Sequence, residues 1–434
     1  MKKKTAVLLI IVMLSLLLSG CRVEGMGSLA VYNPDGYYDF DLAAQKLSSA
    51  SGKNVSAELL ESIGKEKVSL LVSDAESGVF TEKSWLHATG YSYLANLDLF
   101  SGAVSSENVR DLGSNGKSTF DVSFVGDVLY DPDYSPMAHA ENMGGVLECI
   151  DTEVVDYLQA SDILLINNEF SIGTRGEPLS GKTWTFQASP ESVQIHKDLG
   201  ADIVSLANNH VYDYGETGFF DTLAHLEAAG MPYVGAGRNL DEAKQAQYFI
   251  VNGIKVGIVA ASRAEKVYFT PVATEDSAGI MGTYESADFL EAIREADAQC
   301  DILIAYVHWG TENSVKLEKA QKTMAREYID AGVDAIIGGH THCVQGIEFY
   351  DGKPIFYSVG NFWFSSYTLD SCVATLRVDN DMNVQPIFVP LIQKGCETHL
   401  LEGEERREYL DKIENFEPQS VSISDDGIVT EKQP

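Results

Sequence analysis

The sequence is poor in cysteine and shows no internal repeat. It contains six cysteines among 434 residues and no Cys-X-X-Cys motif. Cys21 belongs to an N-terminal targeting pattern, and the five cysteines that remain of the six cannot pair completely. A disulfide framework is therefore not expected. We expect most of these five to be small buried side chains.

Positive charge is also scarce. The chain has 31 Lys and Arg against 64 Asp and Glu, which gives a formal net charge of −33. Such a surface repels phosphate backbones, so nucleic-acid binding is not expected. It also repels an anionic polymer unless metal ions or local basic patches intervene. The plain interpretation of the charge is solubility outside a cell.

A basic and apolar segment begins the chain. Lys2 to Lys4 precede the apolar run from Ala6 to Leu18, which only Ser15 interrupts. This pattern predicts a secretory signal over residues 1–20, and the run is shorter than the roughly 20 residues of a transmembrane helix. Leu18-Ser19-Gly20-Cys21 resembles a bacterial lipobox, which implies lipidation of Cys21 and an extracytoplasmic protein anchored to the cell membrane. The alternative is an uncleaved signal anchor.

The remaining chain divides by pattern into three regions. Residues 21–118 carry no strong motif and form a spacer or a small region of unknown structure. Residues 119–400 alternate short apolar runs with helical patterns. Residues 401–434 are charged, with one helix and an acidic tail that we expect to be frayed.

The central region predicts layered α/β structure, because strands and helices alternate. Three hairpins, at Asn252-Gly253, Asp351-Gly352 and around Asp379 to Met382, favour a mixed sheet or two sheets over a purely parallel one. The predicted strands are 119–125, 162–168, 201–207, 301–307 and 333–337. The predicted helices are 150–160, 191–199, 216–229, 287–296, 317–331 and 404–413.

Polar side chains follow five of these strands, at the end where open α/β sheets place their sites. They include three of the chain's nine histidines after the last two strands and a fourth after the third. Carboxylate, amide and imidazole groups suit Zn, Mn or Fe, and the absence of a cysteine ligand disfavours a structural zinc site. The residues are Asp127, Glu169, Asn208, Asn209, His210, Asp213, His308, His340 and His342.

Residues 119–364 resemble the CapA family, which is related to calcineurin-like phosphoesterases and 5′-nucleotidases. The resemblance implies an α/β/β/α sandwich of the metallophosphoesterase type with mixed sheets. The matching segments are FVGD (124–127), NNE (167–169), FQASP (186–190), SLANNHVYDYG (205–215), YVGAG (233–237), VHWGTE (307–312), GGHTHCVQG (338–346) and YSVGNFWF (357–364).

The resemblance also implies roles for individual residues. His210 is the implied catalytic histidine, and Asp213 is placed to orient it. One or two divalent ions, Mn, Fe or Zn, are implied, with Asp127, Glu169, Asn209, His308, His340 and His342 as ligands. Further groups expected beside the metal or the substrate are Asn167, Asn208, Arg263, Glu312, Gln345 and Asn361.

The sequence departs from the phosphoesterase pattern at two positions. Leu129 stands where the phosphoesterases have a histidine ligand, so one metal loses a ligand. Glu169 stands where they have a bridging aspartate. Asp131 and Asp133 are alternative ligands, although an exposed turn around Pro132 is the simpler interpretation.

Three functional hypotheses follow. The first is a metal-dependent hydrolase of a phosphoester, or of an amide or ester in a cell-surface polymer, acting in capsule or poly-γ-glutamate synthesis. The second is a non-catalytic, metal-containing subunit that works with membrane polymer-synthesis proteins in assembly or export. The third is a solute-binding lipoprotein. Among nearby residues, we expect Arg175 and Lys182 to be exposed to solvent and Trp363 and Phe364 to belong to the core.

Overall fold

The computed structural model describes residues 39–51, 55, 57, 60, 65–76, 108–265 and 269–432. The chain forms two units, Met1–Gly102 and Ala103–Pro434. In the first unit, helices α2 (Phe40–Ser51) and α4 (Lys65–Glu76) bury apolar side chains such as Leu47 and Val68. The predicted signal segment and Cys21 lie outside the described residues. Among the described helices, none combines the length and apolar character needed to cross a membrane.

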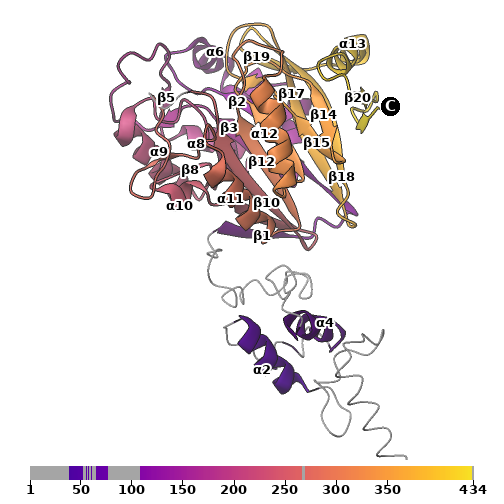
Figure 1. The fold of residues 1–434 in the computed structure, drawn as a ribbon. Helices are drawn as coiled ribbons and strands as arrows, with labels where there is room; N and C mark the ends of the chain where they lie inside the picture. Colours follow the sequence, from indigo (N-terminus) through magenta and orange to yellow (C-terminus); the bar gives the residue numbers. More distant parts are fainter. Residues whose placement is uncertain are drawn as a thin grey trace, which may run out of the picture. The chain divides into compact units, whose positions relative to one another are not determined.

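The second unit is built on two large mixed sheets (Figure 1). In the first sheet, β2, β3, β6 and β7 are parallel, and β17, β18 and β19 continue from β2 as antiparallel neighbours. The short strand β16 also pairs with β2. The strand order is β19 (Glu397–Leu400), β18 (Val384–Lys394), β17 (Leu369–Asp379), β2 (Thr119–Val128), β3 (Ile163–Asn168), β6 (Ile203–Ser205) and β7 (Tyr233–Val234), with β16 at Asn361–Trp363.

The second sheet has seven strands and contains two of the predicted hairpins. Asn252 and Gly253 have φ of 54° and 81°, and Asp351 and Gly352 have φ of 51° and 73°. These left-handed pairs suit two-residue hairpin turns, which confirms both predictions. The strand order is β1 (Val109–Gly113), β9 (Gln247–Val251), β10 (Ile254–Ser262), β12 (Ile302–His308), β13 (Ala335–Gly339), β15 (Lys353–Phe356) and β14 (Ile347–Tyr350).

Helices cover the outer faces of the two sheets, and an apolar core lies between the sheets. On the first sheet lie α6 (Ser135–Met143), α7 (Thr152–Gln159), α8 (Ser192–Asp198) and α9 (Gly215–Ala229). On the second lie α11 (Ala287–Asp297), which packs against β10 and β12, and α12 (Lys319–Asp330), which packs against α11 (Figure 1). The predicted α/β/β/α sandwich with mixed sheets is confirmed.

Short elements complete the unit and connect its layers. The third predicted hairpin is confirmed by the antiparallel pairing of β17 with β18. The remaining elements are η4 (Val146–Cys149), β4 (Ser171–Ile172), β5 (Gln187–Ala188), β8 (Ala236–Gly237), α10 (Leu240–Ala243), β11 (Gly279–Ile280), α13 (Gly403–Glu414), β20 (Val421–Ile423) and β21 (Val429–Glu431).

Two expected boundaries differ from the structure. Strand β1 falls in the region assigned to the spacer, yet it pairs in parallel with β9, so the folded unit begins before residue 119. The acidic C-terminal tail is not frayed: β20 and β21 pair with each other. Their side chains Val421, Ile423 and Val429 are buried in the core between the sheets, and this burial holds the tail in place.

Candidate metal centre

The polar strand ends that the sequence singled out meet at one edge of the sandwich. Asp127 lies in β2, Glu169 follows β3, and Asn209 follows β6. From the second sheet, His308 ends β12, and His340 and His342 follow β13. Groups from both sheets therefore face one another, and all six side chains are buried or nearly so.

Tight backbone turns set the direction of the last two histidines. A Cβ on Gly338 would lie 2.0 Å from the carbonyl oxygen of Tyr357, so only glycine fits at this strand end. His340 and His342 then take left-handed φ angles of 89° and 54°. For a residue with a Cβ, this conformation costs about 1–2 kcal/mol. Strain of this kind is characteristic of functional sites.

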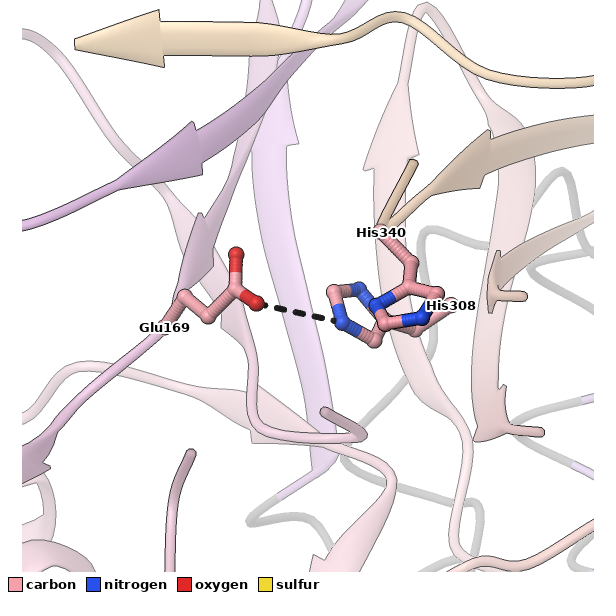
Figure 2. Close-up of side chains that lie close together, drawn as sticks. All are labelled: Glu169, His308 and His340. Atoms are coloured by element: carbon pink, nitrogen blue, oxygen red, sulfur yellow. Dashed lines mark ion pairs between the residues drawn. The ribbon is translucent and has the colours of Figure 1, made fainter. Parts of the chain in front are cut away.

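The carboxylates and imidazoles form two overlapping groups whose ligand atoms lie within 4.8 Å of one another. One group is Glu169, His308 and His340, and the other is Asp127, Glu169 and His342. Figure 2 shows the Glu169 carboxylate directed toward the rings of His308 and His340, with Oε1 3.3 Å from Nε2 of His308. Glu169 belongs to both groups, so its carboxylate could serve either of them.

Several ligand atoms lack a hydrogen-bond partner although they are buried. Within the described part of the chain, these include both carboxylate oxygens of Glu169, Oδ2 of Asp127 and Nδ1 of His340. Imidazole nitrogens do approach two of the oxygens, from His308 to Glu169 at 3.3 Å and from His342 to Asp127 at 3.1 Å. Burying unpaired carboxylate oxygens is costly. One or two divalent cations held by these two groups would satisfy such atoms, so the residues present fit a metal ion.

The protonation states follow from burial and from the pairing of charges. Burial lowers the pKa of His308 to about 3 and holds that of His340 well below its usual value. Burial alone would raise the pKa of Asp127, but the close contact with His342 and the nearby imidazoles lower it. Burial, followed by the charge of Asp127, raises the pKa of Glu169. The neutral imidazoles of His308 and His340 and the ionised carboxylate of Asp127 are forms that bind metals.

Amide side chains hold the ligands in place. The Oδ1 atom of Asn209 lies 2.9 Å from Nε2 of His308, so its oxygen points into the same cluster. Asn167 donates through Nδ2 to Oδ1 of Asp127 at 2.7 Å.

Two further amides contact the histidines. Asn208 accepts from the backbone N–H of His210 at 3.0 Å. Asn361 Oδ1 lies 2.7 Å from Nδ1 of His342. These amides orient the ligands, as expected for the surroundings of a metal site.

His210 lies beside this cluster in a chain of polar contacts. Its Nδ1 is 2.7 Å from Oδ2 of Asp213, which also accepts from the backbone N–H of Phe186 at 2.8 Å. The other carboxylate oxygen, Oδ1, pairs with Nζ of Lys182 at 2.8 Å. Burial lowers the pKa of His210, although the charge of Asp213 opposes the shift. The structure therefore presents a neutral imidazole oriented by a buried carboxylate.

The expectation that Lys182 is exposed is wrong. Its side chain is only 5% exposed, because Asp213 and the backbone carbonyl oxygen of Asn209 both accept from its ammonium group. Glu265 adds a longer contact of 3.4 Å. Arg175, by contrast, is exposed and pairs with Asp221 of α9. No sequence pattern marks Lys182, because its burial depends on Asp213 and Asn209 folding against its loop.

The other three residues expected beside the metal or the substrate are Arg263, Gln345 and Glu312. Arg263 pairs with Glu318 at 3.2 Å and lies over the ring of Tyr284. Gln345 is buried and accepts from Gln321 of α12 at 2.8 Å, which ties the loop to that helix. Glu312 is exposed, and its charge acts to raise the pKa values of Glu169 and His342.

The residues after β2 do not extend the ligand set. Leu129 is 2% exposed and belongs to the core on the helix-covered face of the first sheet. Asp131 accepts from the backbone N–H groups of Asp133 and Gln187, at 2.9 and 2.7 Å. It therefore holds the loop and is not part of either candidate metal group.

Aromatic rings border the site on one side. Trp363 is buried in the core as predicted, but Phe364 is only partly buried and lies 4.9 Å from the ring of His342. Phe186 lies 4.3 Å from the ring of His210, and the two phenylalanines are 5.6 Å apart. The segments FQASP and YSVGNFWF carry these rings, but no periodicity in them shows that the rings lie beside histidines.

Several known proteins are similar to this chain. The PGA biosynthesis protein CapA of Bacillus subtilis (strain 168) is 31% identical over 244 residues, which cover 56% of this chain and 62% of the relative. The capsule biosynthesis protein CapA of Bacillus anthracis is 31% identical over 252 residues, covering 56% and 61%. A probable polyglutamine synthesis accessory protein of Mycobacterium tuberculosis is 33% identical over 210 residues, covering 46% and 55%. The chain thus spans about three fifths of the length of the curated relatives that it matches.

Solved structures resemble this chain less closely than these relatives do. A 5′-nucleotidase from Candida albicans SC5314 has a TM-score of 0.35 and 14% sequence identity, covering 62% of this chain and 51% of that chain. This degree of likeness is too low to bear on the fold or the activity. The family model described as bacterial capsule synthesis protein PGA_cap matches residues 121–366, which is more than half of the 434 residues. The chain belongs to this family of bacterial capsule synthesis proteins.

Proposed function

We propose that this protein is a metal-dependent hydrolase of a phosphoester, or of an amide or ester in a cell-surface polymer. The observation that carries the proposal is the pairing of two features. Buried ligand atoms without hydrogen-bond partners form the metal cluster, and a neutral histidine oriented by a carboxylate lies next to it. A purely structural metal site would not need the second feature.

Asp127, Glu169, Asn209, His308, His340 and His342 are the residues that would hold one or two ions of Mn, Fe or Zn. When bound, such ions supply Lewis acidity toward the reacting group and lower the pKa of bound water. In the neutral ring of His210, Nδ1 carries the proton that faces Asp213, so Nε2 is free to exchange a proton with the substrate. His210 takes a proton from water or, once protonated, gives one to the leaving atom.

The proposed setting is capsule or poly-γ-glutamate biosynthesis at the cell surface. The names of the relatives, which include PGA biosynthesis protein and capsule biosynthesis protein, support this setting. The partners we propose are membrane lipid attached at Cys21, membrane polymer-synthesis proteins, and an anionic polymer or phosphoester substrate.

Metal content and turnover test the hydrolase proposal together. The full-length protein is dialysed, its metal is measured by mass spectrometry, and it is assayed with phosphodiester, phosphomonoester and γ-glutamyl nitrophenyl substrates. We expect bound Mn, Fe or Zn and turnover that His210→Ala abolishes. The matched control is His225→Ala, which removes a histidine from α9 outside the site. Metal binding without turnover that depends on His210 would count against hydrolysis.

One observation favours a second candidate, a non-catalytic metal-containing subunit of a polymer assembly or export complex. Leu129 is buried in the core at the position where the phosphoesterase pattern has a ligand. A metal centre without that ligand still binds an ion through the remaining groups. This candidate predicts metal retention, no turnover, and co-purification with membrane polymer-synthesis proteins.

Anchoring through Cys21 is tested separately. In cells fed a radiolabelled fatty acid, the protein should be labelled and should sediment with membranes. Cys21→Ser should lose the label and leave the membrane fraction or remain unprocessed. Equal labelling of both proteins would contradict lipidation at Cys21.

A further inference from the structure

A pocket of about 450 Å³ opens on the helix-covered face of the first sheet. Its floor is apolar and consists of Val373 of β17 and of Ile387 and Val389 of β18. Val154 of α7 and Ile428, next to β21, add apolar walls. None of the residues that line the pocket is a candidate metal ligand. A volume of roughly 300–1,000 Å³ and a mostly apolar lining are characteristic of sites for small molecules.

The polar groups inside the pocket already have partners. The hydroxyl group of Tyr157 donates to Oγ1 of Thr375 at 2.9 Å. The guanidinium group of Arg377 donates to both carboxylate oxygens of Asp121, at 2.8 and 2.7 Å. Strands β17 and β18 are each paired with a neighbour on both sides. A peptide lying in the pocket would therefore find few partners for its N–H and C=O groups, whereas a hydrocarbon chain needs none.

Arg406 of α13 brings a positive charge to the rim of this pocket. Its Nε atom donates to the backbone carbonyl oxygen of Asp425 at 2.8 Å. Its two other guanidinium nitrogens make no hydrogen bond or ion pair with any described residue. Burial lowers the pKa of Arg406, although the charges of Asp426 and Asp425 oppose the shift. A half-buried guanidinium group with two nitrogens to spare suits a phosphate group, which it can bind through two parallel hydrogen bonds.

Two carboxylates share the rim with this guanidinium group. Glu153 and Asp426 both line the pocket, and both are exposed. They disfavour a ligand that carries only negative charge, as does the net charge of −33 of the chain. A ligand with an ammonium group beside its phosphate matches both signs of charge at the rim.

We propose that this pocket binds a zwitterionic phospholipid. Its acyl chain lies on the apolar floor, its phosphate group binds Arg406, and its ammonium group lies beside Glu153 and Asp426. This binding is separate from the chemistry proposed for the metal centre. The anchoring proposed at Cys21 would bring such lipids within reach of the protein.

Competition between matched ligands tests this inference. The full-length protein is purified in a sugar detergent, and retained ligands are measured by native mass spectrometry. The ligands are lysophosphatidylethanolamine, lysophosphatidylglycerol with the same acyl chain, and phosphoethanolamine without a chain. We expect the first to bind most tightly, because the second lacks the ammonium group and the third lacks the chain. Arg406→Ala should weaken its binding about tenfold, through the loss of charged hydrogen bonds. Glu153→Gln should narrow the difference between the two lipids.

Two further variants serve as controls. Arg294→Ala removes an exposed arginine from α11 and should leave lipid binding unchanged. Ile428→Trp fills the pocket from a partly exposed position, so it should abolish lipid binding while the melting temperature shows that the protein is folded. His210→Ala should bind the lipid normally, which separates this inference from the hydrolase proposal.

Several results would overturn the inference. Tighter or equal binding of the anionic lipid would show that the rim does not select a zwitterion. Equal binding of phosphoethanolamine would show that the pocket holds no acyl chain. Undiminished binding by Arg406→Ala or by folded Ile428→Trp would place the lipid elsewhere. If none of the three ligands binds, the pocket is left to a protein partner and the inference fails.

Discussion

Lys182 shows how one buried charge can fix the geometry of a neighbouring pair. Its ammonium group neutralises the carboxylate of Asp213, the residue that orients His210. We predict that Lys182→Met lowers the free energy of unfolding by about 3–5 kcal/mol, because it leaves the buried charge of Asp213 unpaired. The measurement is chemical denaturation at neutral pH. Lys244→Met is the control: this lysine makes contacts of 3.4 to 3.9 Å at the surface, and its loss should cost less than about 1 kcal/mol.

His196 provides a prediction about acid stability. It is fully buried, its Nε2 lies 2.9 Å from Oδ1 of Asn168, and burial lowers its pKa to about 3. Below pH 6.5 the unfolded chain therefore binds a proton at this residue and the folded chain does not, until the pH approaches 3. Stability should fall with pH across this window by up to about 1.4 kcal/mol per pH unit from this residue alone.

The measurement is the free energy of unfolding between pH 7 and pH 4, for the unmodified protein and for His196→Phe. Replacing the histidine removes the titrating group and leaves a ring of similar shape among Tyr130 and Phe170. The variant should lose less stability as the pH falls. Parallel pH profiles for the two proteins would show that His196 is not neutral in the folded state.

For individual residues, the sequence indicated which ones lie at strand ends but not what surrounds them in the fold. Asp127, His308 and His340 could be selected because each follows an apolar run and the fold gathers such ends. The burial of Lys182 could not be predicted, because the residues that enclose it are far along the chain. Arg263 also follows a strand, but its guanidinium group forms an ion pair with Glu318, which lies in another loop.

Among the secondary-structure elements, the C-terminal hairpin of β20 and β21 contributes more to the stability of the fold than its acidic composition indicates. Ile423 in β20 is 3% exposed and packs in the core between the sheets. Ile423→Ala should lower the free energy of unfolding by about 2–5 kcal/mol, as expected for a buried isoleucine. Leu112→Ala in β1 is the control, because that side chain is 44% exposed and its loss should have a small effect. Equal and small losses would mean that the hairpin is not part of the folded core.

The hairpins of this fold were predictable because their turns carry a local signal. Asn252-Gly253 and Asp351-Gly352 adopt the left-handed angles that these residue types favour. Strand β1 had no such signal. It is an edge strand whose side chains are largely exposed, and it is defined by its backbone pairing with β9, more than 130 residues away. A strand fixed by distant pairing leaves little pattern in its own sequence.

In the whole molecule, the candidate metal centre joins the two sheets. Asp127 and Glu169 belong to the first sheet, and His308 and His340 to the second. An ion bound between them stabilises only the folded sandwich, by about 4 kcal/mol when its concentration is 1,000 times its Kd. We therefore predict that chelation lowers the melting temperature and that adding back Mn or Zn restores it. Asp127→Asn should show a smaller shift, whereas an unmodified protein insensitive to chelation would contradict the site.

The position of the centre across two sheets also affects when an ion can be acquired during synthesis. The first sheet's ligands are complete once residue 209 has been made, and they supply only oxygen atoms. Such a half-site suits Mg or Ca, whereas the imidazoles that favour Mn, Fe or Zn arrive with residues 308 to 342. The preference for Mn, Fe or Zn that we propose would therefore be a late property of the growing chain. Under the proposed export, the supply of ions outside the cytoplasm would then determine which metal the finished site receives.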